Sequence, residues 1–466
     1  MKNKKIIVFC MVAILTIFQF SIFTTKSKAE TKTIEEGDIT ATLDTETGVL
    51  TISGTGEISD NLANSIRFLV RNQDYKVKKV VMGEGITYAP CQVFISLEGL
   101  EEIEVNEKNE EYCSVDGNLY NKDKTEFLIW PCGKSGNFVV PDSVKKIEDY
   151  SFFAAEKLTG VTIPNTVETI GEYAFYECVS LKKVVIPDSV TEIERGAFSN
   201  CYGLEEVELP EGINSIEAET FKNCFGLRYI ELSDKVTSIG TDAFSAVPLI
   251  PLFNGDTSGT VKHEVNPLKI VIPNSVTTIS ENAFRKIDFD NNVVDTTIYC
   301  KSDSAIKQYV DGNESNRKFF DYVIDDDAPT ITKLTQDGSN IVIEATDNDG
   351  CGIKKKGYSL DGENWTDSNK IAVDKSGTYT VYVRDGLYNV SSKEITVDIT
   401  EKKEDDDEGS KEDKKSKSDD TNNKSTEDDT QAKTIIPQTG AKFPFVALIL
   451  AVGVGVIYIK YKNLKF

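Results

Sequence analysis

The sequence has little of what most catalytic and nucleic-acid-binding sites require. Its 466 residues include one histidine, two tryptophans and three methionines, and 52 Lys and Arg stand against 76 Asp and Glu. A single histidine, His263, excludes histidine-rich zinc sites, and any Ser–His or Cys–His catalyst would depend on it. The acidic balance excludes sequence-independent nucleic-acid binding, which needs a basic surface to displace counterions. Composition therefore predicts a protein that is not an enzyme.

The N-terminal segment 1–29 has the layout of a secretory signal peptide. A basic start, residues 1–5, precedes an apolar run over residues 6–23, and Ser27 and Ala29 form a small-x-small exit. We predict cleavage after Ala29. The alternative is an uncleaved membrane anchor.

The end of the chain combines a short motif, an apolar segment and a basic tail. The motif is Ile436, Pro437, Gln438, Thr439 and Gly440. Residues 443–459 would span about 25 Å as a helix, marginal for a bilayer core of about 30 Å. The lysines that follow should stay cytoplasmic. This tail, residues 435–466, resembles the LPxTG sorting signal of Gram-positive surface proteins, with isoleucine where leucine is usual. The resemblance implies that a sortase cuts after Thr439 and joins it to peptidoglycan; the alternative is a single-pass membrane protein.

A period of 23 residues runs through the middle of the chain. Two of its columns are Ile147, Ile170, Ile193, Ile216, Ile239 and Phe152, Phe175, Phe198, Phe221, Phe244. One further unit, residues 272–284, follows after an insertion at about 247–267 that contains His263. Each unit contains a short predicted strand in which alternate residues point to the same side, and a proline ends this strand. Because one unit cannot bury its apolar residues alone, the repeat predicts a stacked solenoid with short parallel strands.

The repeat pattern L-x-x-V-x-I-P-x-x-V-x-x-I-x-x-x-A-F-x-x-C resembles BspA-like leucine-rich repeats. The resemblance covers about residues 35–325 and implies a leucine-rich-repeat solenoid over 61–325, with a capping hairpin over 30–60. We expect a short helix at 304–309 and a closing strand at 319–324. Related repeats serve adhesion, host binding and roles that are not known.

A second module and a stalk follow the solenoid. Strand-like runs separated by Asp-Gly turns over residues 326–399 predict a small all-β sandwich. Phrases such as GTYTVYVRDGLYNV resemble bacterial Ig-like repeats. Residues 400–430 hold 13 acidic and 7 basic side chains and no apolar one, so we predict a disordered acidic stalk over 400–434.

Strand alternation predicts which side chains face outward from the solenoid. One column should contain Lys183, Glu206 and Tyr229, and the next Val185, Glu208 and Glu231. These six residues are the candidate ligand-binding patch, and its glutamates favour basic partners. The alternative is a solvated face that binds nothing.

Other candidate metal, redox and phosphate motifs are better explained by a structural role than by ligand binding or catalysis. Cys178, Cys201 and Cys224 share one column, which a metal site, a redox pair or a stack of small buried residues would explain; we favour the stack. A disulfide among Cys91, Cys113 and Cys132 stays open. The fragment at 133–136 lacks the first glycine of a phosphate-binding loop. The pattern Asp347-x-Asp349-Gly350 fails as an EF-hand, which leaves a non-EF calcium site or a polar turn.

The sequence thus predicts a wall-anchored bacterial surface protein without catalytic residues, metal or cofactor. We expect the solenoid to act as an adhesin for a host protein, another cell surface or a glycan. A spacer without a ligand is the alternative, and a hydrolase that depends on His263 in the insertion is a third, weaker hypothesis.

Overall fold

The computed structural model describes residues 30–73, 75–246, 265–280, 282–286, 294, 296–312, 321–348 and 350–399. The segments predicted as signal peptide, stalk and sorting motif, the segment 443–459 and most of the insertion, including His263, lie outside the described residues. Among the helices that are described, none has the length and apolar character needed to cross a membrane.

The described chain begins with an antiparallel meander that leads into the solenoid. Its strands are β1 (Thr31–Glu36), β2 (Ile39–Asp44) and β3 (Val49–Glu57). Strand β3 also pairs in parallel with β4 (Lys79–Met82) and β5 (Gly85–Tyr88), and β4 pairs with β6 (Glu102–Val105). Strands β2 and β3 form an antiparallel hairpin, and β1 pairs with β2 as a further strand. Because β3 pairs on both sides, it changes the sheet from antiparallel to parallel.

Two helices cover this first sheet. They are α2 (Asp60–Gln73) and α3 (Gln92–Ile95). Helix α2 buries Leu62, Ile66 and Val70 along one face at helical spacing, and the amide of Leu62 donates to the Ser59 hydroxyl at the start of the helix. The sequence-based predictions include no helix here, although a capping serine followed by apolar residues at this spacing is a readable signal.

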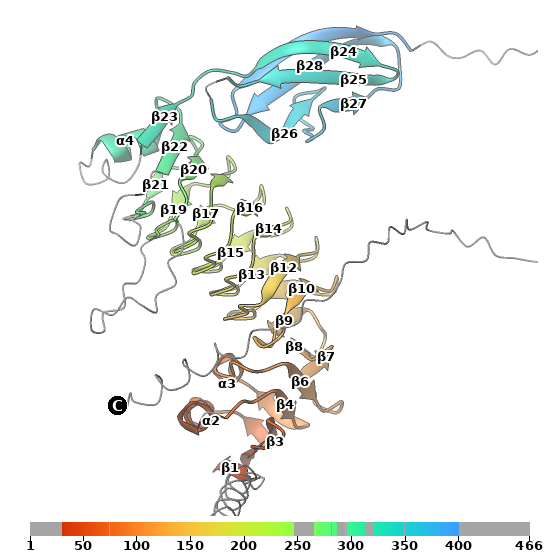
Figure 1. The fold of residues 1–466 in the computed structure, drawn as a ribbon. Coiled ribbons are helices and arrows are strands. Elements are labelled where there is room, and N and C mark those ends of the chain that lie inside the picture. The colour runs from red at the N-terminus through yellow and green to blue at the C-terminus, as the bar shows by residue number, and fades with distance from the viewer. Residues whose placement is uncertain are drawn as a thin grey trace, which may run out of the picture. The chain divides into compact units, whose positions relative to one another are not determined.

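The solenoid stacks short parallel strands in two ladders (Figure 1). The first ladder contains β10 (Gly136–Val139), β12 (Leu158–Thr162), β14 (Lys183–Val185), β16 (Glu206–Glu208), β18 (Tyr229–Glu231), β20 (Leu268–Val271), β22 (Thr296–Cys300) and β23 (Asp321–Ile324). The second contains β9 (Glu126–Ile129), β11 (Lys146–Ile147), β13 (Thr169–Ile170), β15 (Glu192–Ile193), β17 (Ser215–Ile216), β19 (Ser238–Ile239) and β21 (Thr278–Ile279). Each ladder consists of two hydrogen-bonded sheets, which are separated between β12 and β14 in the first ladder and between β15 and β17 in the second. An antiparallel pair, β7 (Tyr112–Val115) and β8 (Asn118–Asn121), precedes β9. Helix α4 (Ala305–Asp311) lies between β22 and β23, near the positions expected for a helix and a closing strand.

The strand register reproduces the sequence period. Lys183 pairs with Glu206, and Glu206 pairs with Tyr229, so each step along the ladder is one repeat of the sequence. Tyr229 then pairs with Lys269, on the far side of the insertion, which therefore leaves the ladder in register. The predicted solenoid with short parallel strands is confirmed.

The core of the solenoid is a column of stacked phenylalanine rings. Phe152 and Phe175 have centroids 4.6 Å apart at 7°, and Phe175 and Phe198 have centroids 5.0 Å apart at 3°. These rings are fully buried, and the isoleucine column beside them is buried as well. Every repeat thus contributes the same apolar layer, which a single unit could not bury alone.

The C-terminal module contains two antiparallel three-stranded sheets. One is formed by β24 (Thr330–Asp337), β25 (Asn340–Thr346) and β27 (Lys370–Ala372). The other is formed by β26 (Ile353–Ser359), β28 (Gly377–Asp385) and β29 (Val390–Val397). The sheets share one apolar cluster that includes Ile341, Ile343, Val381 and Val383.

Candidate functional site

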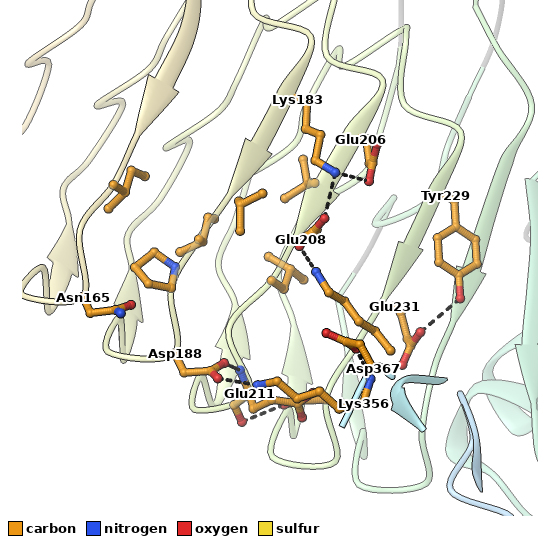
Figure 2. A pocket seen from close by; sticks show the side chains of 18 of the residues that line it. Asn165, Lys183, Asp188, Glu206, Glu208, Glu211, Tyr229, Glu231, Lys356 and Asp367 are labelled. Carbon is orange, nitrogen blue, oxygen red and sulfur yellow. Dashed lines mark hydrogen bonds and ion pairs between the residues drawn. The ribbon is translucent and has the colours of Figure 1, made fainter. Parts of the chain in front are cut away.

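A groove of about 730 Å³ lies over the first ladder (Figure 2). Its walls are outward side chains of β12, β14, β16 and β18 together with Lys354, Lys355, Lys356 and Asp367 of the C-terminal module. The six residues predicted as a ligand-binding patch all line this groove: Lys183, Val185, Glu206, Glu208, Tyr229 and Glu231. The structure therefore brings every member of the predicted patch to one surface.

Ion pairs and hydrogen bonds organise the charged part of the groove. The Lys183 ammonium lies 2.7 Å from a Glu206 oxygen and 2.8 Å from a Glu208 oxygen, and Figure 2 shows it between the two carboxylates. The Tyr229 hydroxyl donates to Glu231 at 3.1 Å. Burial, with the nearby Glu231 carboxylate, raises the pKa of Tyr229 far above its usual value, so the phenol stays a hydrogen-bond donor.

The N-terminal part of the groove is neutral and more apolar. Val161, Thr162 and Ile163 line it, and Val185 is 47% exposed. Val139, which pairs with Thr162 in the neighbouring strand, is 66% exposed. The first ladder thus presents an apolar end beside a charged end, and a ligand can contact both.

Three consecutive lysines of β26 close the charged end. The Lys354 side chain is 3% exposed, and its ammonium lies 2.5 Å from Glu231 and 3.6 Å from Glu211. Burial lowers the pKa of Lys354, but Glu231, Tyr388 and Glu211 outweigh it, and the net pKa is raised. The lysine therefore stays charged although it is buried.

The other two lysines bind neighbouring repeats. Lys355 pairs with Glu208, and the Lys356 ammonium lies 2.5 Å from Asp188. The Asp188 carboxylate also accepts the Glu211 amide, and its pKa is lowered, first of all by the hydrogen bond from Lys356. The sequence predicts that the glutamates of the patch are available to an external partner. In the structure, however, Glu208 and Glu231 are already paired with lysines of the same chain.

Sequence reasoning missed the acids at the edge of the groove, and a signal for them existed. Asp188 and Glu211 each follow the proline that ends a strand, and Asp234 occupies the same repeat position. The hydroxyl of Tyr388, from the module, donates to a Glu211 carboxylate oxygen at 3.4 Å and accepts from the Asp234 amide at 2.9 Å. These three acids form a third outward column, at the repeat position one residue after the proline.

A separate cluster of possible metal ligands lies where the module begins. Asp325, Asp347, Cys351 and Asp385 place ligand atoms within 4.8 Å of one another, and they could hold a cation. Protein donors already bind these carboxylates: the Gly352 amide reaches Asp347 and the Cys351 amide reaches Asp325. Asp347 belongs to the pattern considered above for calcium, while its companion Asp349 lies outside the described residues.

Burial and crowding change how this cluster ionises. Burial raises the pKa of Asp385 to about 6, and the carboxylates of Asp325 and Asp347 act in the same direction. Burial also raises the pKa of Asp347. Burial and mutual repulsion thus make it unfavourable for these carboxyl groups to be ionised together near neutral pH.

The cysteine column is structural. Cys178, Cys201 and Cys224 are buried, and each thiol lies 3.0–3.2 Å from the carbonyl of a phenylalanine in the preceding repeat, at Phe152, Phe175 and Phe198. All eight cysteines in the described residues are free thiols. Burial raises the pKa of Cys201 and Cys224 well above the usual value, which keeps these thiols protonated and unreactive.

Short parallel strands that recur once per repeat around a shared apolar core define the middle of the chain as a leucine-rich-repeat solenoid. Residues 128–250 match, in six copies, the family described as the BspA type leucine rich repeat region. The family describes a repeat and not a catalytic domain.

Solved structures of similar proteins include three bacterial ones. A leucine-rich repeat protein from Eubacterium ventriosum is 21% identical, with 48% of this chain and 98% of that chain covered and a TM-score of 0.29. The pneumococcal vaccine antigen PcpA is 22% identical, with 54% and 56% covered and a TM-score of 0.31. A leucine rich cell surface protein from Faecalibacterium prausnitzii is 16% identical, with 61% and 98% covered and a TM-score of 0.29. No curated protein matches the chain.

Proposed function

We propose that this chain is a bacterial surface protein whose solenoid binds a ligand along the outward face of the first ladder. The observation that carries the proposal is the groove, which collects all six predicted residues and combines exposed apolar side chains with charged ones. A host protein, another cell surface or a glycan is the expected ligand. The repeat family supports a role in display and binding over a catalytic one.

Binding by this face is tested with a matched pair of variants. Val185→Asp places a charge on the exposed apolar part of the groove, whereas Thr191→Asp adds the same charge at an exposed residue next to β15 in the second ladder. The full chain would be tested by biolayer interferometry against extracellular-matrix proteins, host cells and glycan arrays. We expect Val185→Asp to weaken binding at least tenfold and Thr191→Asp to leave it unchanged.

Two results of this experiment would contradict the proposal. Equal loss in both variants would place the ligand elsewhere. Absence of binding by the unmodified chain to every member of the panel would favour the alternative, a spacer without a ligand. Hydrolysis of a panel member that His263→Ala abolishes would instead support the third hypothesis.

The proposal includes export and covalent attachment to the Gram-positive cell wall. Residues 1–29 would direct secretion, and sortase would join Thr439 to peptidoglycan after recognising Ile436 to Gly440. The segment 443–459 would hold the chain in the membrane until that step. Thr439→Ala should move the protein from the wall fraction to the membrane or the medium, while Thr434→Ala, outside the motif, should not; an unchanged wall fraction contradicts the anchoring.

The remaining segments would position the solenoid away from the wall. The two sheets around one core support an Ig-like module over residues 326–399. The acidic stalk, residues 400–434, would then cross the wall, because a fully extended chain of this length reaches about 120 Å. Partial proteolysis of the exported chain should cut first within this stalk and leave the solenoid with the module intact.

A further inference from the structure

Strand β26 has a local irregularity that turns three successive lysines toward the solenoid. In a regular strand Lys355 would face away from Lys354 and Lys356, because side chains alternate. Here the pairing of β26 with β28 shifts register between Ile353 and Tyr358, and Lys356 has a left-handed backbone with φ of 55°. A bulge of this kind re-aims side chains, and all three lysines consequently reach carboxylates of the solenoid.

The residue after the lysines is required for this shape. A Cβ atom at Gly357 would lie 2.4 Å from the Lys354 carbonyl oxygen, so a larger residue would displace the bulge. The left-handed Lys356 is itself an uncommon conformation that the surroundings must hold. The Lys-Lys-Lys-Gly segment is therefore shaped for contact with a set of acids, which solubility alone would not require.

The acids that receive the lysines come from three repeats of the solenoid. Asp188 belongs to one repeat, Glu208 and Glu211 to the next, and Glu231 to the one after it. They lie in two outward columns, and Figure 2 shows Glu208, Glu211 and Glu231 directed toward the same region of the groove. We call these four residues the acidic receptor.

We propose that the acidic receptor binds a lysine-rich extended segment of a partner protein, and that Lys354, Lys355 and Lys356 occupy the receptor in cis as an internal competitor. This inference rests on the proposed function of the outward face and specifies the chemistry of its ligand. The chain itself shows which chemistry fits: an extended backbone with three neighbouring ammonium groups and a small residue after them. Val185, exposed beside the receptor, adds an apolar contact for the same segment.

Competition in cis sets how strongly a partner must bind. A segment tethered to its site has an effective concentration on the order of millimolar, so a partner at lower concentration displaces it only by binding more tightly. The apparent dissociation constant equals the intrinsic one divided by the fraction of molecules in which the receptor is free. Removing the three lysines should therefore tighten binding by the reciprocal of that fraction.

The test uses the full chain and a fluorescent peptide that copies residues 352–359, Gly-Ile-Lys-Lys-Lys-Gly-Tyr-Ser. The variant Lys354→Gln/Lys355→Gln/Lys356→Gln frees the receptor. The control variant Lys333→Gln/Lys370→Gln/Lys375→Gln removes the same charge from exposed lysines elsewhere on the module. Fluorescence anisotropy at about 150 mM salt, where the Debye length is about 8 Å, suppresses attraction to the overall negative charge.

We expect the freed variant to bind the peptide at least tenfold more tightly than the unmodified chain and the control. Adding Glu211→Gln/Glu231→Gln to the freed variant should abolish the gain. Equal affinities for the freed and control variants, or no peptide binding by any of them, would overturn the inference. Circular dichroism and thermal unfolding of each variant establish that the chain is folded.

This experiment separates the inference from the proposed function. Binding of a panel ligand that Val185→Asp weakens, without peptide binding, refutes the lysine-rich partner and leaves the proposed function standing. Peptide binding that Glu211→Gln/Glu231→Gln abolishes, without binding of any panel ligand, supports the receptor and removes support for the adhesin.

Discussion

The buried pair of Lys354 and Glu231 should contribute strongly to the attachment of the module. Both side chains are largely removed from water, at 3% and 14% exposed, and their charged atoms are 2.5 Å apart. Removing one member of such a pair leaves a buried charge, which typically costs about 3–5 kcal/mol. Glu211 at 3.6 Å keeps part of the compensation for Lys354, so we expect Glu231→Gln to lose about 2–3 kcal/mol.

The pair is best measured by a double-mutant cycle of Glu231→Gln and Lys354→Met. Urea unfolding would be followed by the fluorescence of Trp365 in a Trp130→Phe background, since the chain has only these two tryptophans. We expect a coupling energy of about 1.5–3 kcal/mol. The exposed pair of Lys370 and Asp337 is the control, at less than about 1 kcal/mol. A Glu231–Lys354 coupling no larger than the control's would refute the reasoning.

Three other expected outcomes concern the core, a turn and pH. Phe198→Ala should cost about 3–5 kcal/mol in chemical unfolding because it empties the middle of the ring column, whereas a cost below about 1 kcal/mol would contradict the role given to that column. Gly196→Ala should lower the melting temperature, because the glycine has φ of 62° and a Cβ would lie 2.2 Å from the Tyr173 ring; Tyr173→Ala should recover part of the loss, and no recovery would exclude the steric cause. The folded-state pKa of Asp385, about 6, exceeds the ordinary value, so its contribution to stability is present at low pH and is lost as pH rises through about 6. Asp385→Asn should therefore lessen the fall in module stability between about pH 4 and pH 6, and an unchanged pH profile would argue against this origin.

Much of the solenoid could be predicted because identical units stack in register. The repeat period fixes which residues share a column, and strand alternation then assigns Lys183, Glu206 and Tyr229 to the outward side. The phenylalanine column followed from the same argument. The helix at Asp60–Gln73 lies outside the repeat, and only its local spacing and cap could have indicated it.

The completed groove could not be predicted in the same way. Lys354 and Glu231 are 123 residues apart, and no local pattern indicates that a module packs against a particular repeat. The bulge at Lys356 also breaks the alternation from which side-chain directions are inferred. The acids after the strand-ending prolines could be recognised from the sequence as a column. Their partners in the module, such as Lys356 and Tyr388, could not.

The central claim, that ligand binds along the first ladder, is tested most directly by carboxyl footprinting of the full chain. Glu206 in the groove and Glu192 in the second ladder are both exposed, and carbodiimide labelling of each can be followed by mass spectrometry. With a saturating ligand from the binding panel, the account predicts that labelling of Glu206 slows several-fold while labelling of Glu192 is unchanged. Protection of Glu192 with Glu206 still labelled at its free rate would contradict it.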